Sequence, residues 1–280
     1  MDDLIEEHIA ALALTHSPDT IQARHNVLRR LHEDLPKGLG EATTEQLRAW
    51  LSRKHLSPWS RYTYTSHVLA AYRWWTRRGN LDGDPTADIE RPSQPRGIAR
   101  PIKEMHLAIL LAQPEPMPTI ALLGGYGGLR RSEICDVDRE HVDEDLIIVV
   151  RPKGGHGAQT VPTHPIIWEH IKDLPDGPVV RWHGGRMRRM DLTHLWERTR
   201  LDLGLPKELV PHMLRHRYGT VIQREGRDLR VTQECMRHAS VASTQIYTQV
   251  TDRQRAAAVA LLPPVRFEPG PSRLEPAQTA

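Results

Sequence analysis

The residues with the clearest chemical potential lie in one stretch near the C-terminal end of the sequence. His212, Arg215 and His216 follow the pattern His-x-x-Arg-His, and His238 and Tyr247 come after them. Imidazoles can move protons, a guanidinium can pair with two phosphate oxygens, and a phenol can act as a covalent nucleophile. Such groups can hold and attack a phosphodiester without a metal. We therefore hypothesise that Tyr247 is a nucleophile and that its substrate is DNA.

Breaking and rejoining a DNA strand requires further groups. The non-bridging oxygens of the phosphate need cationic donors that are in place before the transition state forms, and two arginines suit this. A phenol with an ordinary pKa of about 10 needs nearby positive charge to become reactive. The leaving 5′-oxygen needs a proton donor, for which lysine or histidine is suitable. The rest of the chain must supply these groups.

Two upstream segments provide candidates. Residues 128–134 read GLRRSEI, in which Arg130 and Arg131 precede a Ser-Glu pair. Residues 146–151 (LIIVVR) and 160–164 (TVPTH) flank the glycine-rich segment KGGHGAQ. Two short apolar runs around such a segment predict a β-hairpin, and this hairpin would carry Lys153 at its tip.

Taken together, these segments resemble the tyrosine recombinases, the phage-integrase family. GLRRSEI is similar to the family's first box, and HMLRH at residues 212–216 is similar to its second box, H-x-L-R-H. The closing segment, MRHAS at 236–240 and TQIY at 244–247, places Tyr247 nine residues after the histidine. Lys153 matches the family's hairpin lysine. The resemblance covers residues 100–262, and the order and spacing of the four motifs make the joint match specific.

The resemblance implies catalytic roles for the matching side chains. Arg130 and Arg215 would clamp the scissile phosphate, and His212 would hydrogen-bond to it and help to manage protons. Lys153 would be the general acid that protonates the 5′-oxygen.

The remaining matching residues complete the expected site. His238 would contact the phosphate or orient the attack, and Tyr247 would form a 3′-phosphotyrosine. Glu133 and His216 would support the site or the fold rather than touch phosphate. Neither a metal nor a nucleotide cofactor is implied.

Three features of the motifs leave alternatives. Arg131 lies beside Arg130, which is chosen because it follows Gly-Leu directly. His212 and His216 have a spacing that also permits a zinc pair, but no glutamate follows the first histidine and no third ligand stands out. The family usually has glycine before the third-box histidine, where this chain has Arg237. This arginine would alter the local turn or add a phosphate contact.

The elements that position these residues are mostly helical. Helical spacing, Pro-containing helix starts and glycine ends predict four N-terminal helices, at about 3–14, 18–35, 44–54 and 58–79. After them we expect the hairpin, a short strand near 178–182, and helices near 103–112, 118–126, 165–172, 191–203 and 252–262. The predicted fold class is mainly α with a small β-sheet, comprising an N-terminal helical core-binding domain and a tyrosine-recombinase catalytic domain.

Composition shifts divide the chain into four segments. Residues 91–101 (RPSQPRGIARP) are rich in proline, glycine and arginine and lack periodicity, as is typical of a linker. We expect a helical DNA-binding domain at 1–90, this linker, a catalytic domain at 102–262, and a flexible tail at 263–280. The chain begins directly with the helical unit, so we expect a short integrase without an arm-binding domain.

The fourth predicted helix interleaves basic and aromatic residues. Tyrosine and tryptophan at helical spacing indicate a packed core, whereas the arginines could contact a DNA backbone. The candidate phosphate-contacting residues on this helix and in the linker are Arg73, Arg77, Arg78, Arg96 and Arg100.

Composition bounds the class of protein. The chain has 280 residues, 39% hydrophobic and 26% charged, as expected for a globular protein. The formal net charge of +3 is too small to indicate nucleic acid by itself. Two cysteines are too few for a disulfide framework, and neither a secretory signal nor a membrane-spanning run is present. We expect a cytoplasmic, nucleoid-associated protein of a bacterial cell.

The resemblance implies site-specific DNA recombination through a 3′-phosphotyrosine and a Holliday junction. Integration or excision of phage or mobile-element DNA is the first expectation, and chromosome-dimer resolution is the alternative within the family. A type IB topoisomerase and a DNA-binding regulator without activity are the rivals outside it. The expected partners are double-stranded DNA with specific core sites, a homotetramer of this chain on DNA, and an accessory directionality factor.

Overall fold

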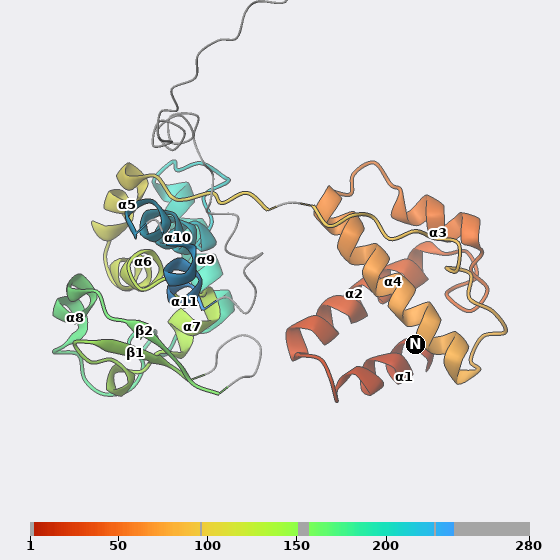
Figure 1. Ribbon diagram of the computed structural model, residues 1–280, viewed down its shortest axis with the longest axis horizontal. Helices are drawn as coiled ribbons and strands as arrows, with labels where there is room; N and C mark the ends of the chain where they lie inside the picture. The colour runs from red at the N-terminus through yellow and green to blue at the C-terminus, as the bar shows by residue number, and fades with distance from the viewer. Residues whose placement is uncertain (1–2, 96, 151–156, 227, 238–280) are drawn as a thin grey trace, which may run out of the picture. The chain divides into compact units, whose positions relative to one another are not determined.

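The computed structural model describes residues 3–95, 97–150, 157–226 and 228–237, which fall into two compact units (Figure 1). The first unit contains the described residues up to Ile98, and the second contains most of those from Ala99 onward. Each unit is described by itself below. The assignment of separate functions to the two parts of the chain remains a prediction.

The described residues of the first unit form four helices: α1 (Asp3–Leu12), α2 (Pro18–Asp34), α3 (Thr44–Leu51) and α4 (Pro58–Arg78). The predicted starts at Pro18 and Pro58 are confirmed. Proline suits the first helical position because the amide it lacks would have no helical partner. At α3, Thr43 and Gln46 form a reciprocal capping box, which fixes where this helix begins.

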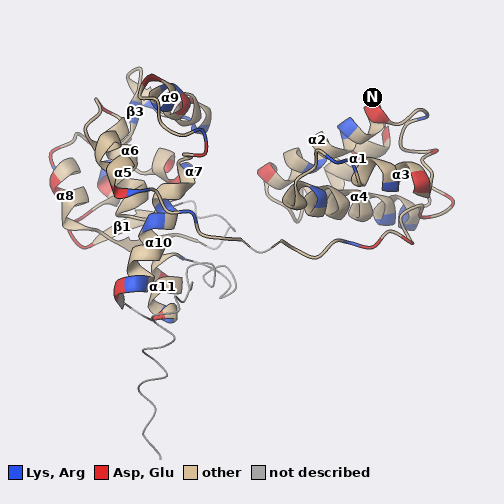
Figure 2. Ribbon diagram, turned by 90° about the horizontal axis from the view of Figure 1, so that it is seen from above, with Lys and Arg blue, Asp and Glu red and all other residues tan. Residues whose placement is uncertain are grey.

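The aromatic residues of α4 divide between packing and surface. Tyr72 and Trp75 are fully buried, and they donate hydrogen bonds to the backbone carbonyls of Leu39 (2.9 Å) and Leu4 (2.8 Å). These two aromatics therefore belong to the core. Arg73, Arg77 and Arg78 are exposed on the same helix, so α4 combines buried aromatic residues with exposed arginines. Figure 2 colours the Lys and Arg positions along α4 blue.

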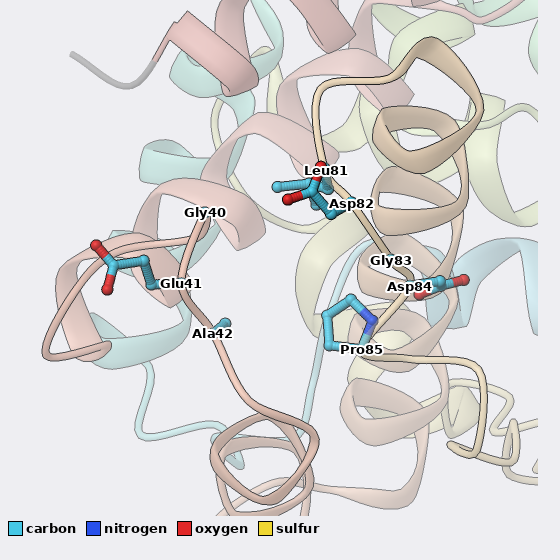
Figure 3. Close-up of a pocket in the computed structure, with 8 residues that line it drawn as sticks. All are labelled: Gly40, Glu41, Ala42, Leu81, Asp82, Gly83, Asp84 and Pro85. Atoms are coloured by element: carbon cyan, nitrogen blue, oxygen red, sulfur yellow. The ribbon is translucent and has the colours of Figure 1, made fainter.

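An open pocket in the first unit is lined by residues 40–42 and 81–85 (Figure 3). Its charged lining residues are Glu41, Asp82 and Asp84. The Asp84 carboxylate accepts hydrogen bonds from the backbone N–H (2.8 Å) and hydroxyl (2.6 Å) of Thr86, which shape this loop. Because the pocket carries only carboxylates as charges, it is unsuited to phosphate.

The second unit is built around a buried helix. Helix α6 (Met117–Gly125) is buried at every residue, and α5 (Glu104–Leu111), α7 (Arg131–Asp136) and α8 (Pro165–Ile171) pack near it. Gly124 permits a close approach to the later helix α10 (His212–Gly226), because an added Cβ would lie 2.9 Å from Leu214. The unit also contains α9 (Arg189–Asp202), α11 (Leu229–Cys235) and a short 3-10 helix at Arg139–His141.

Two short hairpins complete the described part of this unit. Strand β1 (Leu146–Val149) pairs antiparallel with β2 (Gln159–Pro162), in a register that sets Leu146 opposite Pro162. Strands β3 (Arg181–Trp182) and β4 (Gly185–Arg186) form the second hairpin. The predicted fold class, mainly α with a small β-sheet, is confirmed. The predicted hairpin is present, but Lys153, which was expected at its tip, lies outside the described residues, as do the helix expected at 252–262 and the tail at 263–280.

Candidate active site

The loop before α7 positions the first candidate arginine. Glu133, in the first turn of α7, accepts a hydrogen bond from the backbone N–H of Arg130 (2.8 Å) and one from its Nη1 (2.8 Å). The carboxylate thus caps the helix and orients the guanidinium at the same time. The neighbouring Arg131 is exposed, and its Nη1 donates to the Thr193 hydroxyl on α9 at 2.8 Å. This geometry separates the two adjacent arginines, since only Arg130 points to Glu133.

The second candidate arginine, Arg215 on α10, is 2% exposed. Its Nη1 donates to the carbonyl of Gly128 and its Nη2 donates to the carbonyl of Met236. A buried guanidinium is costly unless its donors are satisfied, and these carbonyls compensate for part of that cost. Arg215 thereby joins the loop of the first box to the turn that follows α11.

That turn brings Arg130 and Arg215 to the same place. Arg130 Nη2 donates to the carbonyl of Arg237 at 3.4 Å, and Arg215 bonds to the carbonyl one residue earlier. The Arg237 side chain pairs with Glu133 through Nη2–Oε2 (2.6 Å) and Nη1–Oε1 (3.2 Å). Two arginines that are 85 positions apart in the sequence therefore meet on adjacent carbonyls.

The local charge of this cluster is positive. Arg130 and Arg237 both pair with the carboxylate of Glu133, whose side chain is fully buried, and Arg215 binds the carbonyl of Met236 beside them. Burial alone would raise the pKa of Glu133, but the hydrogen bond and charge of Arg237, followed by those of Arg130, hold it below its ordinary value. Glu133 therefore stays ionised at neutral pH, and the excess of guanidinium groups favours an anionic ligand such as a phosphate.

The two histidines of the second box differ in exposure. His212 is exposed at the start of α10, and His216 is half-buried one turn later, with ring centroids 4.6 Å apart. Burial lowers the pKa of His216 to about 4, and the charges of His212 and Arg215 act in the same direction. His216 is thus neutral near pH 7. Within the part of the chain that the structure describes, no three His, Cys, Asp or Glu side chains gather at a possible metal site.

Several predicted site residues cannot be placed by this geometry. Lys153, His238, Tyr247 and Arg96 lie outside the described residues. Arg73, Arg77, Arg78 and Arg100 are exposed, and Arg78 lies 3.6 Å from Glu7. Arg237 was expected to alter the turn or to contact phosphate, and its pairing with Glu133 was not foreseen. The departure from the family's glycine was the signal that marked this position.

Comparisons with known proteins show the family to which the chain belongs. A family model, that of the phage integrase family, matches residues 112–254, about half of the chain. The chain belongs to the phage integrase family. It is therefore a tyrosine recombinase, an enzyme that cleaves and rejoins DNA strands in site-specific recombination.

Relatives within the family match most of the chain. Tyrosine recombinase XerC of Neisseria meningitidis serogroup B is 31% identical over 252 residues, covering 83% of this chain and 75% of that protein. Tyrosine recombinase XerC of Rhodospirillum centenum is 30% identical over 252 residues, covering 78% of this chain and 72% of that protein.

Solved structures show the same fold. The Tn1549 transposon integrase in complex with a circular intermediate DNA has a TM-score of 0.72 at 18% identity, covering 92% of this chain and 98% of that one. A lambda integrase dimer bound to a COC′ core site has a TM-score of 0.72 at 15% identity, covering 90% and 98%.

Proposed function

We propose that this tyrosine recombinase integrates or excises phage or mobile-element DNA, with Tyr247 as its nucleophile. The observation that carries the proposal is the meeting of Arg130 and Arg215 on the carbonyls of residues 236 and 237. The chain passes directly from this turn into the segment that contains His238 and Tyr247. Tyr247 thus follows Arg237, whose carbonyl accepts a hydrogen bond from Arg130, by ten residues.

The proposed chemistry has two symmetrical steps. The Tyr247 hydroxyl oxygen attacks the phosphorus, its proton leaves by way of His212 and solvent, and the bond from phosphorus to the 5′-oxygen breaks. Lys153 protonates the leaving 5′-oxygen. Arg130 and Arg215 stabilise the charge that develops on the non-bridging oxygens. In the second step a 5′-hydroxyl of the partner strand gives its proton to Lys153 and attacks the phosphorus, the bond from phosphorus to the tyrosine oxygen breaks, and Tyr247 recovers a proton by way of His212 and solvent.

Four protomers on two DNA sites would exchange the strands in pairs through a Holliday junction. The solved relatives include an integrase in complex with a circular intermediate DNA and another bound to a core site, which supports double-stranded DNA as the partner. The exposed basic face of α4, with Arg73, Arg77 and Arg78, is suited to contacts with the phosphate backbone, as are Arg96 and Arg100. An accessory directionality factor would set the balance between integration and excision.

A second candidate use is resolution of chromosome dimers by a XerC-type recombinase. The similarity to curated XerC sequences over about four fifths of the chain favours this candidate. The location of the cleaved sites separates the two uses. Sites at the ends of a mobile element support integration or excision, and a single chromosomal site supports dimer resolution.

The proposal is tested by trapping the covalent intermediate. The protein is incubated with sheared DNA from the organism that encodes it, and protein-linked fragments are recovered after denaturation with detergent. The recovered sequences define a duplex that is nicked beside the cleavage position. Cleavage of this duplex releases a short fragment that carries the 5′-hydroxyl, and religation stops because this fragment diffuses away. We expect the wild-type adduct to survive denaturant and to vanish in Tyr247→Phe, because the phenol oxygen forms the bond.

Tyr64→Phe is the matched control for this experiment. Tyr64 stacks on Trp50 with ring centroids 5.6 Å apart, and this stacking is retained by phenylalanine. The control should form the adduct as the wild-type protein does. An adduct of normal yield in Tyr247→Phe would show that another residue is the nucleophile.

A further inference from the structure

Arg237 occupies a backbone conformation that favours glycine. Its φ is +50°, in the left-handed region where a Cβ crowds the following carbonyl. The residue directly follows Met236, which is fully buried beneath the turn. A glycine here would avoid the strain. An arginine in this conformation costs free energy, which an interaction of its side chain can offset.

The compensation is a two-point pairing with Glu133. Oε1 of the carboxylate accepts from Nη1 of both Arg130 and Arg237, at 2.8 and 3.2 Å. Oε2 accepts from the backbone N–H of Arg130 at 2.8 Å and from Nη2 of Arg237 at 2.6 Å. A carboxylate has about four lone-pair sites, and here all of them are used. Arg237 thus fixes the carboxylate that orients Arg130.

The backbone of the same turn holds both candidate clamp residues. The Arg237 carbonyl accepts from Arg130 at 3.4 Å, and the preceding carbonyl accepts from Arg215. A rotation of this turn would displace both guanidinium groups together. The pairing of the Arg237 side chain with Glu133 opposes such a rotation, because it ties the turn to α7.

Burial argues against direct contact between Arg237 and the substrate. The Arg237 side chain is 4% exposed and pairs with a carboxylate that is fully buried. The Arg130 side chain is 20% exposed and can be reached by a ligand. The two arginines share one carboxylate but have different access to solvent. Arg130 can therefore contact a ligand, whereas Arg237 acts through Glu133.

We propose that Arg237 is a positioning residue of the cleavage reaction, which orients Arg130 through Glu133 and fixes the turn that leads to His238 and Tyr247. The inference rests on the proposed function, since it concerns the support of the same site. It adds a residue that the family motif does not contain, because the motif has glycine at this position.

Two substitutions of Arg237 test the role. Arg237→Gly removes the guanidinium and also the backbone strain, so the turn itself remains accessible. We expect single-turnover cleavage of the nicked duplex to slow by about 100-fold, the size of effect that a misplacement of about 1 Å can cause. The affinity for the same duplex should be unchanged, since Arg237 does not reach the substrate. Arg237→Lys retains the charge without the two-point geometry and should give an intermediate rate.

The pH profile separates positioning from simple folding. Loss of Arg237 removes a cation that lowers the pKa of Glu133, so the carboxylate should become protonated at a higher pH. Protonated Glu133 no longer holds Arg130 as a charged partner. The acid limb of the cleavage rate should therefore move to higher pH in Arg237→Gly. In a Glu133→Gln background, Arg237→Gly should slow cleavage much less than it does alone.

Arg230→Gln is the matched control. It removes an arginine that pairs with Glu234 at 2.7 Å on the adjacent helix, but this side chain is 80% exposed. The control should cleave at the wild-type rate. Wild-type cleavage and an unchanged pH profile in Arg237→Gly would overturn the inference, as would a loss of affinity equal to the loss of rate. If Arg237→Gly does not fold, a wild-type rate in Arg237→Lys overturns it. Failure of the wild-type protein to cleave would instead contradict the proposed function.

Discussion

At the scale of single residues, the candidate site depends on a glycine with two constraints. Gly128 has a φ of +61°, and a Cβ added to it would lie 2.4 Å from Cδ1 of Tyr218. Its carbonyl also accepts a hydrogen bond from Arg215. A side chain at this position would therefore strain the backbone, displace the tyrosine ring, and move an acceptor of the candidate clamp.

We predict that Gly128→Ala destabilises the protein by about 2–4 kcal/mol, because left-handed strain and overpacking act together. Single-turnover cleavage should fall as well, since the carbonyl that holds Arg215 moves. Denaturant unfolding and the nicked-duplex assay measure the two effects.

The matched control is Gly204→Ala. Gly204 has nearly the same φ, +60°, but nothing lies within 4 Å of an added Cβ. It should cost about 1 kcal/mol, from backbone strain alone, and leave cleavage intact. Equal losses of stability in the two variants would refute the role assigned to the Tyr218 contact.

Sequence motifs identified Arg130 and Arg215, but they did not reveal what holds them. The choice of Arg130 over Arg131 followed from its place after Gly-Leu, and the structure supplies a reason in the bond to Glu133. The pairing of Glu133 with Arg237 joins residues 104 positions apart. Such a contact depends on how α7 and α11 pack, which spacing along the chain does not encode.

At the scale of elements, the helices of the first unit share a buried cationic cluster. Arg24 on α2 donates from Nε to His67 Nδ1 on α4 at 3.2 Å, and its Nη1 lies 3.5 Å from His8 Nε2 on α1. Burial is the main cause that lowers the pKa of each histidine to about 4, and the charge of Arg24, then that of His16, adds to it. Both rings are therefore neutral at pH 7, and each can accept a hydrogen bond from Arg24.

We predict that this cluster makes the first unit sensitive to acid. A histidine pKa that is lower in the folded state stabilises the fold above the unfolded value of about 6.5. That stabilisation is lost as the pH falls towards 4. Calorimetry of the full chain should show the unfolding midpoint of the first unit falling by several degrees over this range.

His67→Gln tests the source of this pH dependence. Glutamine keeps an oxygen that can accept from Arg24 Nε but does not titrate, so the dependence should become shallower. His55→Gln, at an exposed histidine of the same unit, should leave it unchanged. The account of the cluster fails if the two variants give the same slope.

Helix starts were the elements most open to prediction from sequence. Ser57-Pro58 and Thr43 mark helix starts through local hydrogen bonds and proline geometry, and the structure has these starts. The buried cluster on α1, α2 and α4 was not predicted, because histidine and arginine in helical sequence usually indicate a solvated face. Their burial depends on how the three helices pack.

At the scale of the whole molecule, the chain folds into two compact units, and the division of DNA binding and catalysis between them remains a prediction. The first exposes a basic helix face, and the second gathers a cluster of arginines around one carboxylate. No helix in the described part of the chain is long and apolar enough to cross a membrane. The order of the motifs predicted the chemistry of the second unit. It did not show how Arg130, Arg215 and the turn at 236–237 come together, because they converge only after folding. The tetramer on DNA and the cytoplasmic, nucleoid-associated location remain predictions.

The central claim is that DNA becomes joined to Tyr247 through its 3′ phosphate. The most direct measurement is peptide mapping by mass spectrometry of the wild-type protein trapped on the nicked duplex, after nuclease digestion of the DNA. We predict a nucleotide linked through its 3′ phosphate to Tyr247, with a free 5′-hydroxyl on the released strand. A linkage to any other residue, or through a 5′ phosphate, would contradict the account.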